Sequence, residues 1–437
     1  MERRVVITGL GVVCPLGDSP AALWEALAAG RSGVSVLERV PPTYLPSKYG
    51  AEVRSFTGAI EDFGPLDKTL QRNIRKNLKV MCREIAMGVA AAQKALTDAR
   101  WNERGFDPDR SGVVYGMDHI FTMPEEFAAG IAKCLDDGGR FQFSDWGRRG
   151  MNEVNPLWLL KYLPNMPASH VAIFNEMRGP NNSLTLREAA SNLAVAESVR
   201  IIARGSADLM IAGATGTRVH PIRTLHVSLQ EEVAGVEGEV TDPAALSRPF
   251  DRDRRGMVLG EGSAALVLES RESAERRGAT IWGEVAGFGS STVQTPQGVA
   301  HRAEAIANAV RQALQMAQME PREIGHIHAH GLATQTCDAE EAQALREVLG
   351  DQADSIPVTA AKSYFGNLGA ASGLVELTAS VLALHHGQLF RTLNYQTPDP
   401  ACPLNVTRTS DVPAGDSFLN INVTPQGQAA AVLVRKA

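Results

Sequence analysis

The sequence predicts an α/β protein built from two similar halves, each with a mainly parallel sheet. Apolar segments of strand length alternate with longer helical stretches along the chain, which is the pattern of βα units. Two short echoes also recur in the same order, Thr8-Gly-Leu-Gly11 with Ala286-Gly-Phe-Gly289 and Ala189-Ala-Ser-Asn-Leu193 with Ala370-Ala-Ser-Gly-Leu374. Matches that keep their order indicate an internal duplication.

The echoes divide the chain into an N-terminal half, residues 1–273, and a C-terminal half, residues 274–437. The two repeated motifs are farther apart along the chain in the first half than in the second. We therefore expect an insertion in the first half, at about residues 100–170. This insertion mixes short apolar helices with turns. Such a segment usually covers a cleft or forms a subunit interface.

The first half opens with an apolar strand at residues 3–13 that ends in glycines, and residues 66–97 read as a helical region. The early part of this region is basic, with Arg72, Arg75, Lys76, Lys79 and Arg83. A basic run is usually a solvated face, and docking of an acidic partner is the alternative.

The chain is organised around the segment from Gly179 to Gly205. Its polar opening, its body of small residues and its closing Arg204-Gly205 are the start, packing and stop signals of one buried helix. Glu188 lies near the start, where backbone N–H groups have no helical partner and the helix dipole favours negative charge. An enzyme can place an activated nucleophile there, and this chain has a carboxylate.

Composition excludes several classes of protein. The 437 residues are 44% hydrophobic, but no apolar run approaches the length of a membrane span, and the N-terminus reads as a strand and not as a signal peptide. We therefore expect a cytoplasmic protein. Five scattered cysteines without CxxC spacing give no sign of a disulfide framework or a zinc site. A net charge of −6 argues against nucleic acid or an anionic membrane as a partner.

Several segments resemble one known family, the β-ketoacyl-(acyl-carrier-protein) synthases, which are ketosynthases of the thiolase superfamily. The segments are Ile7–Gly17, Arg248–Gly262, Ala329-His-Gly331 and Lys362-Ser363, and the resemblance covers nearly the whole chain. It implies a thiolase-like fold, in which two duplicated α/β halves pack as five α-β-α-β-α layers. It also implies an obligate dimer, an acyl chain carried as a thioester on an acyl carrier protein, and no cofactor.

The resemblance also assigns positions in the active site. Active relatives have a cysteine at the head of the buried helix, where the thiol pKa is lowered, and Glu188 falls at that position. His330 retains the first of two catalytic histidines. The second belongs to a Lys-Ser-x-x-Gly-His motif that begins here at Lys362 and ends in Asn367. The glycine-rich loop with the gating phenylalanine is replaced by Asn420–Gln428.

These changes have chemical consequences. A carboxylate is a poor acceptor of an acyl group from a thioester, and a helix N-terminus weakens it further as a base. Condensation through Glu188 is therefore not expected. We expect Glu188 instead to pair with His330 or Lys362 and to fill the former pocket.

The leading hypothesis is a condensation-incompetent subunit, similar to a chain-length factor. It would act with an active ketosynthase and an acyl carrier protein in fatty acid or polyketide biosynthesis, and the carrier would dock at Arg75 and Lys76. Two alternatives stay open. One is a malonyl-carrier-protein decarboxylase or an acyltransferase that uses Glu188 and His330, and the other is a non-catalytic homodimer that binds acyl chains. Whether the chain is an enzyme is thus undecided.

Three histidines, His326, His328 and His330, alternate on a probable strand and would share one face. Metal binding is conceivable for such a set. Because the resemblance places only His330 at the site, we expect no metal.

Overall fold

The strands form one hydrogen-bonded series in which the two halves have the same order. The computed structural model describes residues 3–40, 45–101, 106–236, 238 and 240–437. From the centre outward the first half runs β1-β7-β6-β4-β5 and the second β8-β12-β11-β9-β10, and β1 pairs with β8. This repeated order confirms the duplication. The bounds are β1 Val5–Val13, β4 Ser111–Met117, β5 Asn181–Thr185, β6 Leu209–Thr217, β7 Leu259–Ser270, β8 Gly283–Thr292, β9 His326–His328, β10 Val358–Thr359, β11 Ser417–Val423 and β12 Gln428–Arg435, with a small hairpin of β2 Ser35–Val36 and β3 Tyr49–Ala51 beside β7.

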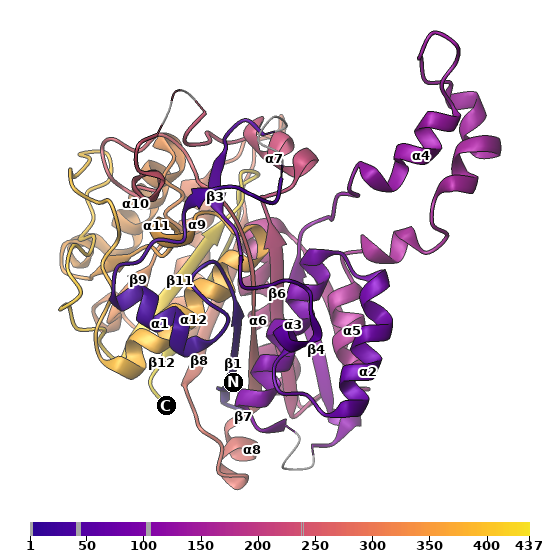
Figure 1. Ribbon diagram of the computed structural model, residues 1–437. Coiled ribbons are helices and arrows are strands. Elements are labelled where there is room, and N and C mark those ends of the chain that lie inside the picture. Colours follow the sequence, from indigo (N-terminus) through magenta and orange to yellow (C-terminus); the bar gives the residue numbers. More distant parts are fainter. Residues whose placement is uncertain (1–2, 41–44, 102–105, 237, 239) are drawn as a thin grey trace.

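The helices complete five layers. Helix α3 covers the outer face of the first half, α6 and α12 lie between the halves, and α9 with α10 covers the outer face of the second half (Figure 1). The α-β-α-β-α arrangement implied by the resemblance is confirmed. The helix bounds are α1 Pro20–Ala28, α2 Lys68–Asn77, α3 Arg83–Asp98, α4 Glu125–Lys133, α5 Met166–Phe174, α6 Ala190–Ala203, α7 Pro221–Ser228, α8 Arg271–Arg276, α9 Arg302–Ala317, α10 Gln335–Leu349, α11 Lys362–Phe365 and α12 Ser372–His386.

The glycine echo has a packing cause. A Cβ at Gly11 of β1 would lie 2.0 Å from the Ala91 carbonyl oxygen of α3, and a Cβ at Gly289 of β8 would lie 2.1 Å from the Ala309 carbonyl oxygen of α9. Both distances are far inside van der Waals contact. The outer helix of each half can therefore approach its central strand only where that strand has no side chain.

One sequence expectation is refined and another is corrected. Four of the five strands in each half run in the same direction, as expected of a mainly parallel sheet, but β7 and β12 run antiparallel to their neighbours. Each of them starts at the edge where the preceding strand of its half ends. The polar segment after Gly179 is also not the opening turn of the helix. It forms the edge strand β5, which pairs in parallel with β4, so tertiary pairing decides its conformation.

The region predicted as an insertion contains an arm at residues 125–153, from α4 through the short helices that follow it, that stands clear of the layered body (Figure 1). Helix α4 and several short turns form it, and its aromatic rings pack on one another, as with Phe127 and Trp146 at 6.0 Å. Apolar side chains remain exposed along it, including Phe143 at 78%. The arm has the composition of an interface segment. The division of the chain at residue 273 stays a prediction.

No helix within the described part of the chain is both long and apolar enough to pass through a membrane.

Candidate functional site

Glu188 lies where β5 gives way to the central helix. A single 3-10 turn, Arg187–Ala189, joins the strand to α6. Arg187 has the positive φ of 52° that this sharp change of direction requires, an unusual conformation for a residue with a side chain. The Glu188 side chain is 2% exposed. The carboxylate therefore stands at the head of α6 inside the protein.

Four charged residues form what we call the buried ion cluster: Glu188, Arg218, Asp118 and Arg223. Arg218 joins its two ends, because its guanidinium donates to Glu188 Oε1 through Nη2 and to Asp118 Oδ2 through Nη1, the latter at 2.9 Å. Arg223 Nη1 lies 2.7 Å from the same Asp118 oxygen. All four side chains are at most 3% exposed. The cluster balances two positive and two negative charges in the interior.

The cluster keeps its carboxylates ionised. Burial alone would raise the pKa of Glu188, but the charges of Arg218 and Arg187 and the hydrogen bond from Arg218 outweigh burial and hold this pKa well below its usual range. The pKa of Asp118 is lowered in the same way, since hydrogen bonds from His119 and Arg218 and the charges of Arg218 and Arg223 overcome its burial. Both are poor bases at neutral pH.

The predicted partners of Glu188 were wrong. Glu188 pairs with Arg218, and not with His330 or Lys362. The Lys362 ammonium lies 2.5 Å from Glu376 Oε1 and donates to the His330 carbonyl oxygen at 2.7 Å. Because Lys362 already has a buried carboxylate of its own, it is not available to Glu188.

His330 stands just beyond β9 in a neutral form. Its Nδ1 faces two donors, Lys362 Nζ and Asn422 Nδ2, each at 3.4 Å, so Nδ1 accepts and the proton is on Nε2. Burial and then the Lys362 charge lower the pKa of His330 well below its ordinary value. The Glu376 carboxylate also accepts from Asn422 Nδ2 at 2.8 Å. Hydrogen bonds therefore connect Glu376, Asn422, Lys362 and His330 in one network.

Asn367 joins the two sides of the site. Its Nδ2 donates to Glu188 Oε1 at 3.1 Å, while its Oδ1 accepts from the Gly369 amide at 2.9 Å. The site therefore brings Glu188 and Asn367 into contact and keeps His330 with Lys362. Glu188 Oε2 has no hydrogen-bond donor among the described residues, although Arg187 Nε is 3.4 Å away.

The segment expected to replace the glycine-rich loop is a tight hairpin. Strands β11 and β12 are joined by a turn in which the Thr424 amide donates to the Gln428 carbonyl oxygen at 2.9 Å. The Gln426 side chain reaches Arg187 Nη1 at 3.4 Å. The turn between β11 and β12 therefore contacts Arg187, the residue that precedes Glu188.

The three histidines do not form one site. His326 and His328 share a face, where His326 Nε2 lies 3.1 Å and His328 Nδ1 2.8 Å from Ser380 Oγ. His330 lies beyond the strand with other partners. Within the described ranges, no group of three or more histidine, cysteine, aspartate or glutamate side chains could hold a metal ion.

Arg75 and Lys76 lie in the last turn of α2 on its exposed side, together with Arg72 and Lys68. Leu70 and Ile74 anchor the opposite side of the helix in the core. Arg83 does not belong to this surface, since its guanidinium binds Glu261 at 2.7 Å. The exposed basic face of α2 therefore contains fewer residues than the basic run seen in the sequence.

Sequence reasoning missed Arg218, Asp118 and Arg223. A signal existed, because Asp118 directly follows β4 and Arg218 directly follows β6. The two strands are parallel neighbours, so these residues meet at one edge of the sheet. A charge immediately after each of two adjacent apolar strands could have suggested an ion pair there.

Comparison with known proteins places these features in a family. The chain matches the family model "Beta-ketoacyl synthase, N-terminal domain" over residues 2–274 and "Beta-ketoacyl synthase, C-terminal domain" over residues 282–396. It is 33% identical to the tetracenomycin polyketide synthase ketoacyl synthase alpha subunit of Streptomyces glaucescens, with 99% of this chain and 97% of that protein covered.

Two solved structures cover 100% of this chain and are themselves covered completely. The ishigamide ketosynthase/chain length factor has a TM-score of 0.81 at 27% identity. A type II polyketide synthase acyl-carrier protein in complex with its ketosynthase bound to the hexaketide (AntDE:AntF) has a TM-score of 0.82 at 26% identity.

Proposed function

The chain belongs to the β-ketoacyl synthase family, and from this premise we propose that it is a condensation-incompetent subunit similar to a chain-length factor. It acts beside an active ketosynthase and receives chains from an acyl carrier protein in fatty acid or polyketide biosynthesis. The proposal explains a chain that keeps the architecture of the family around a site without a nucleophile.

One observation carries the proposal, the ion pair of Glu188 with Arg218. The family resemblance puts Glu188 at the position of the nucleophilic cysteine. A carboxylate held ionised by a buried guanidinium is a weak nucleophile toward a thioester and a weak base. Asn367, at the position of the second histidine, contacts this carboxylate, so the polar groups of the site are used to neutralise one another.

The free surfaces support a partner subunit. Strand β5 ends the sheet series, and among the described strands it pairs with β4 alone. Its residues are exposed or half-buried, unlike those of the inner strands. An edge strand with unpaired backbone groups is a template for another chain. The arm at residues 125–153, with exposed apolar side chains such as Phe143, gives a second surface suited to a subunit contact.

The decarboxylase and acyltransferase alternatives have less support. Both need Glu188 and His330 as a working acid and base, yet Glu188 is bound to Arg218 while His330 faces Lys362 and Asn422. A malonyl carboxylate would also meet the negative charge of Glu188. No feature of the site favours these activities over the proposed role.

The identity of the partner subunit can be tested by measuring the mass of the complex that the chain forms. The chain should be purified alone and after co-expression with a ketosynthase from the same organism, and the mass of each complex measured by light scattering. We expect a heterodimer with the ketosynthase. A stable homodimer that excludes the ketosynthase would instead favour the acyl-binding homodimer.

The exposed basic face of α2 should bind the acidic carrier protein. Reversing both charges, Arg75→Glu with Lys76→Glu, is expected to weaken carrier binding at least about tenfold at low salt, because steering and contact charges are both lost. Binding is measured by calorimetry with the purified carrier. A control with the same net charge, Arg276→Glu with Arg322→Glu, changes two other exposed arginines. Equal affinities for both double variants would remove α2 from the docking site.

A further inference from the structure

A depression of about 400 Å³ lies at the surface where the loop after α7 meets the second half of the chain. Four consecutive residues of this loop, 229–232, form one side of it, and we call them the strap. Arg302, the first residue of α9, and Thr334, which caps α10, line the depression from the second half. The strap therefore lies across the boundary between the two halves.

Backbone hydrogen bonds fix the strap at its two ends. The amides of Gln230 and Glu231 both donate to the Val227 carbonyl oxygen of α7 at 3.0 Å. At the other end, the Glu232 carbonyl oxygen accepts from the Met257 amide at 2.8 Å. The side chains between these ends then decide how closely the strap packs on the rest of the protein.

Two side-chain contacts hold the strap in place. Arg187 Nη1 donates to Gln230 Oε1. Arg302 Nη1 donates to Glu231 Oε1 at 2.7 Å, and these two side chains are only 12% and 8% exposed. Because water screens such a pair little, it is stronger than an ion pair at the open surface. Arg302 also binds Glu340 of α10, which is not part of the strap.

The residues behind the strap belong to the site around Glu188. Arg187, which holds Gln230, directly precedes Glu188, and its Nε lies 3.4 Å from Glu188 Oε2. Burial raises the pKa of Glu231, Arg302 opposes this rise, and the charge of Glu188 adds to it. A charge has such an effect only at short range. Glu188 is nevertheless only 2% exposed, so it lies near the depression and is separated from it.

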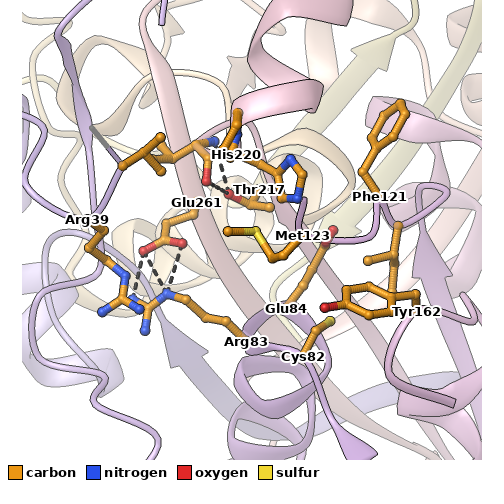
Figure 2. A pocket seen from close by; sticks show the side chains of 14 residues that line it. Arg39, Cys82, Arg83, Glu84, Phe121, Met123, Tyr162, Thr217, His220 and Glu261 are labelled. Carbon is orange, nitrogen blue, oxygen red and sulfur yellow. Dashed lines mark hydrogen bonds and ion pairs between the residues drawn. The ribbon is translucent and has the colours of Figure 1, made fainter. Parts of the chain in front are cut away.

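A second hollow near the site does not lead to Glu188. It is a cavity of about 200 Å³ beside the buried ion cluster, and neither Glu188, His330 nor Asn367 lines it. Figure 2 shows Arg83 and Glu261 at one side of this cavity, where they bind each other at 2.7 Å. The depression beside the strap is therefore the better candidate for an approach to Glu188.

We propose that the strap closes the approach to Glu188 from this depression. Its contacts with Arg187 and Arg302 hold it closed, and their release opens a path to the head of α6. One contact ties the strap to the first half and the other to the second, so closure depends on both halves. This inference deepens the function proposed above and rests on it in one respect, because an idle site in a partner subunit has no need to admit an acyl thioester.

A thiol at position 188 reports how often the strap opens. The chain with Glu188→Cys is treated with iodoacetamide at pH 8, and alkylation is followed by mass spectrometry of the tryptic peptide 188–200, which contains no native cysteine. Two strap variants are compared in this background, Gln230→Ala and Glu231→Ala. Gln230→Ala changes no charge, so a faster reaction of that variant does not come from a shifted thiol pKa.

Glu340→Ala is the matched control, because it removes the other carboxylate on Arg302 and leaves the strap untouched. Circular dichroism shows whether each variant is folded. If Glu188→Cys does not fold, hydrogen exchange of residues 188–192 is measured instead, in the native chain with and without Gln230→Ala. No ketosynthase takes part in either measurement, so the outcome is separate from the mass measurement that tests the proposed function.

We expect both strap variants to raise the alkylation rate about tenfold over Glu188→Cys alone, the effect of losing one charge-assisted hydrogen bond, and Glu340→Ala to leave it unchanged. Faster hydrogen exchange with Gln230→Ala is the equivalent result in the native chain. Closure by the strap is overturned if Gln230→Ala does not speed the reaction, because a rise with Glu231→Ala alone would reflect only the charge near the thiol. It is also overturned if Glu340→Ala speeds the reaction equally, or if the thiol reacts as fast in the folded chain as in the urea-unfolded one.

Discussion

Replacing Arg218 with methionine is expected to lower the free energy of unfolding by about 3–5 kcal/mol, the usual effect of removing one partner from a buried ion pair. The change leaves the carboxylates of Glu188 and Asp118 buried, with Arg223 as the remaining close cation for Asp118. Methionine keeps most of the apolar length of the side chain. Urea unfolding at pH 7, followed by circular dichroism, measures the difference.

A double-mutant cycle separates the ion pair from packing. Glu188→Met combined with Arg218→Met should cost less than the sum of the two single changes, because the double variant no longer buries an unpaired Glu188 charge. Additive losses of unfolding free energy would show that the two side chains do not interact. They would contradict the claim that Glu188 and Arg218 form a stabilising ion pair.

The same pair predicts a pH dependence. The pKa of Glu188 is lowered in the folded chain, so its contribution to stability is present above the pKa of an unfolded glutamate, about 4.3, and is lost as the pH falls through the folded value. The gap in unfolding free energy between the wild type and Arg218→Met should therefore be wide at pH 7 and should decrease progressively as the pH falls below about 4. A gap that stays constant with pH would indicate a packing defect only.

Proline at position 183 is expected to weaken the complex with the ketosynthase at least about tenfold. The Val113 amide donates to the Pro180 carbonyl oxygen at 2.9 Å. Since alternate residues of a parallel strand face the neighbouring strand, the Ser183 amide points away from β4. Among the described residues, it donates to the side-chain oxygen of Asn182 alone, at 2.8 Å. Ser183→Pro thus removes a donor of the free edge and spares the ladder to β4.

Ser183→Ala is the control for this change, because it removes the hydroxyl but keeps the amide. Sedimentation of each variant mixed with the ketosynthase gives the dissociation constants. If Ser183→Pro assembles as well as Ser183→Ala, β5 is not the strand that meets the partner.

The repeated fold could be predicted from the sequence because both halves need the same close contact between an outer helix and a central strand. Gly11 and Gly289 mark the two places where an outer helix touches a central strand, and this need leaves a visible echo. The direction of a strand has no comparable motif in the sequence. The direction of β7 depends on where the long connection from β6 returns to the sheet, which is a tertiary property.

The site was predicted only in part for a similar reason. Family motifs lead directly to Glu188, His330, Lys362 and Asn367, and local signals show that Glu188 heads a helix. The partner of Glu188 is 30 residues away at Arg218. Any of several basic residues could have filled that role, and only the register of β4 beside β6 selects one of them.

The most direct test of the central claim measures two-carbon extension of an acyl carrier protein by this chain alone, free of any ketosynthase, with malonyl carrier protein as donor. The account predicts no extended product from the isolated chain, and product when the ketosynthase is added. Extension by the isolated chain at a rate similar to that of the pair would contradict it.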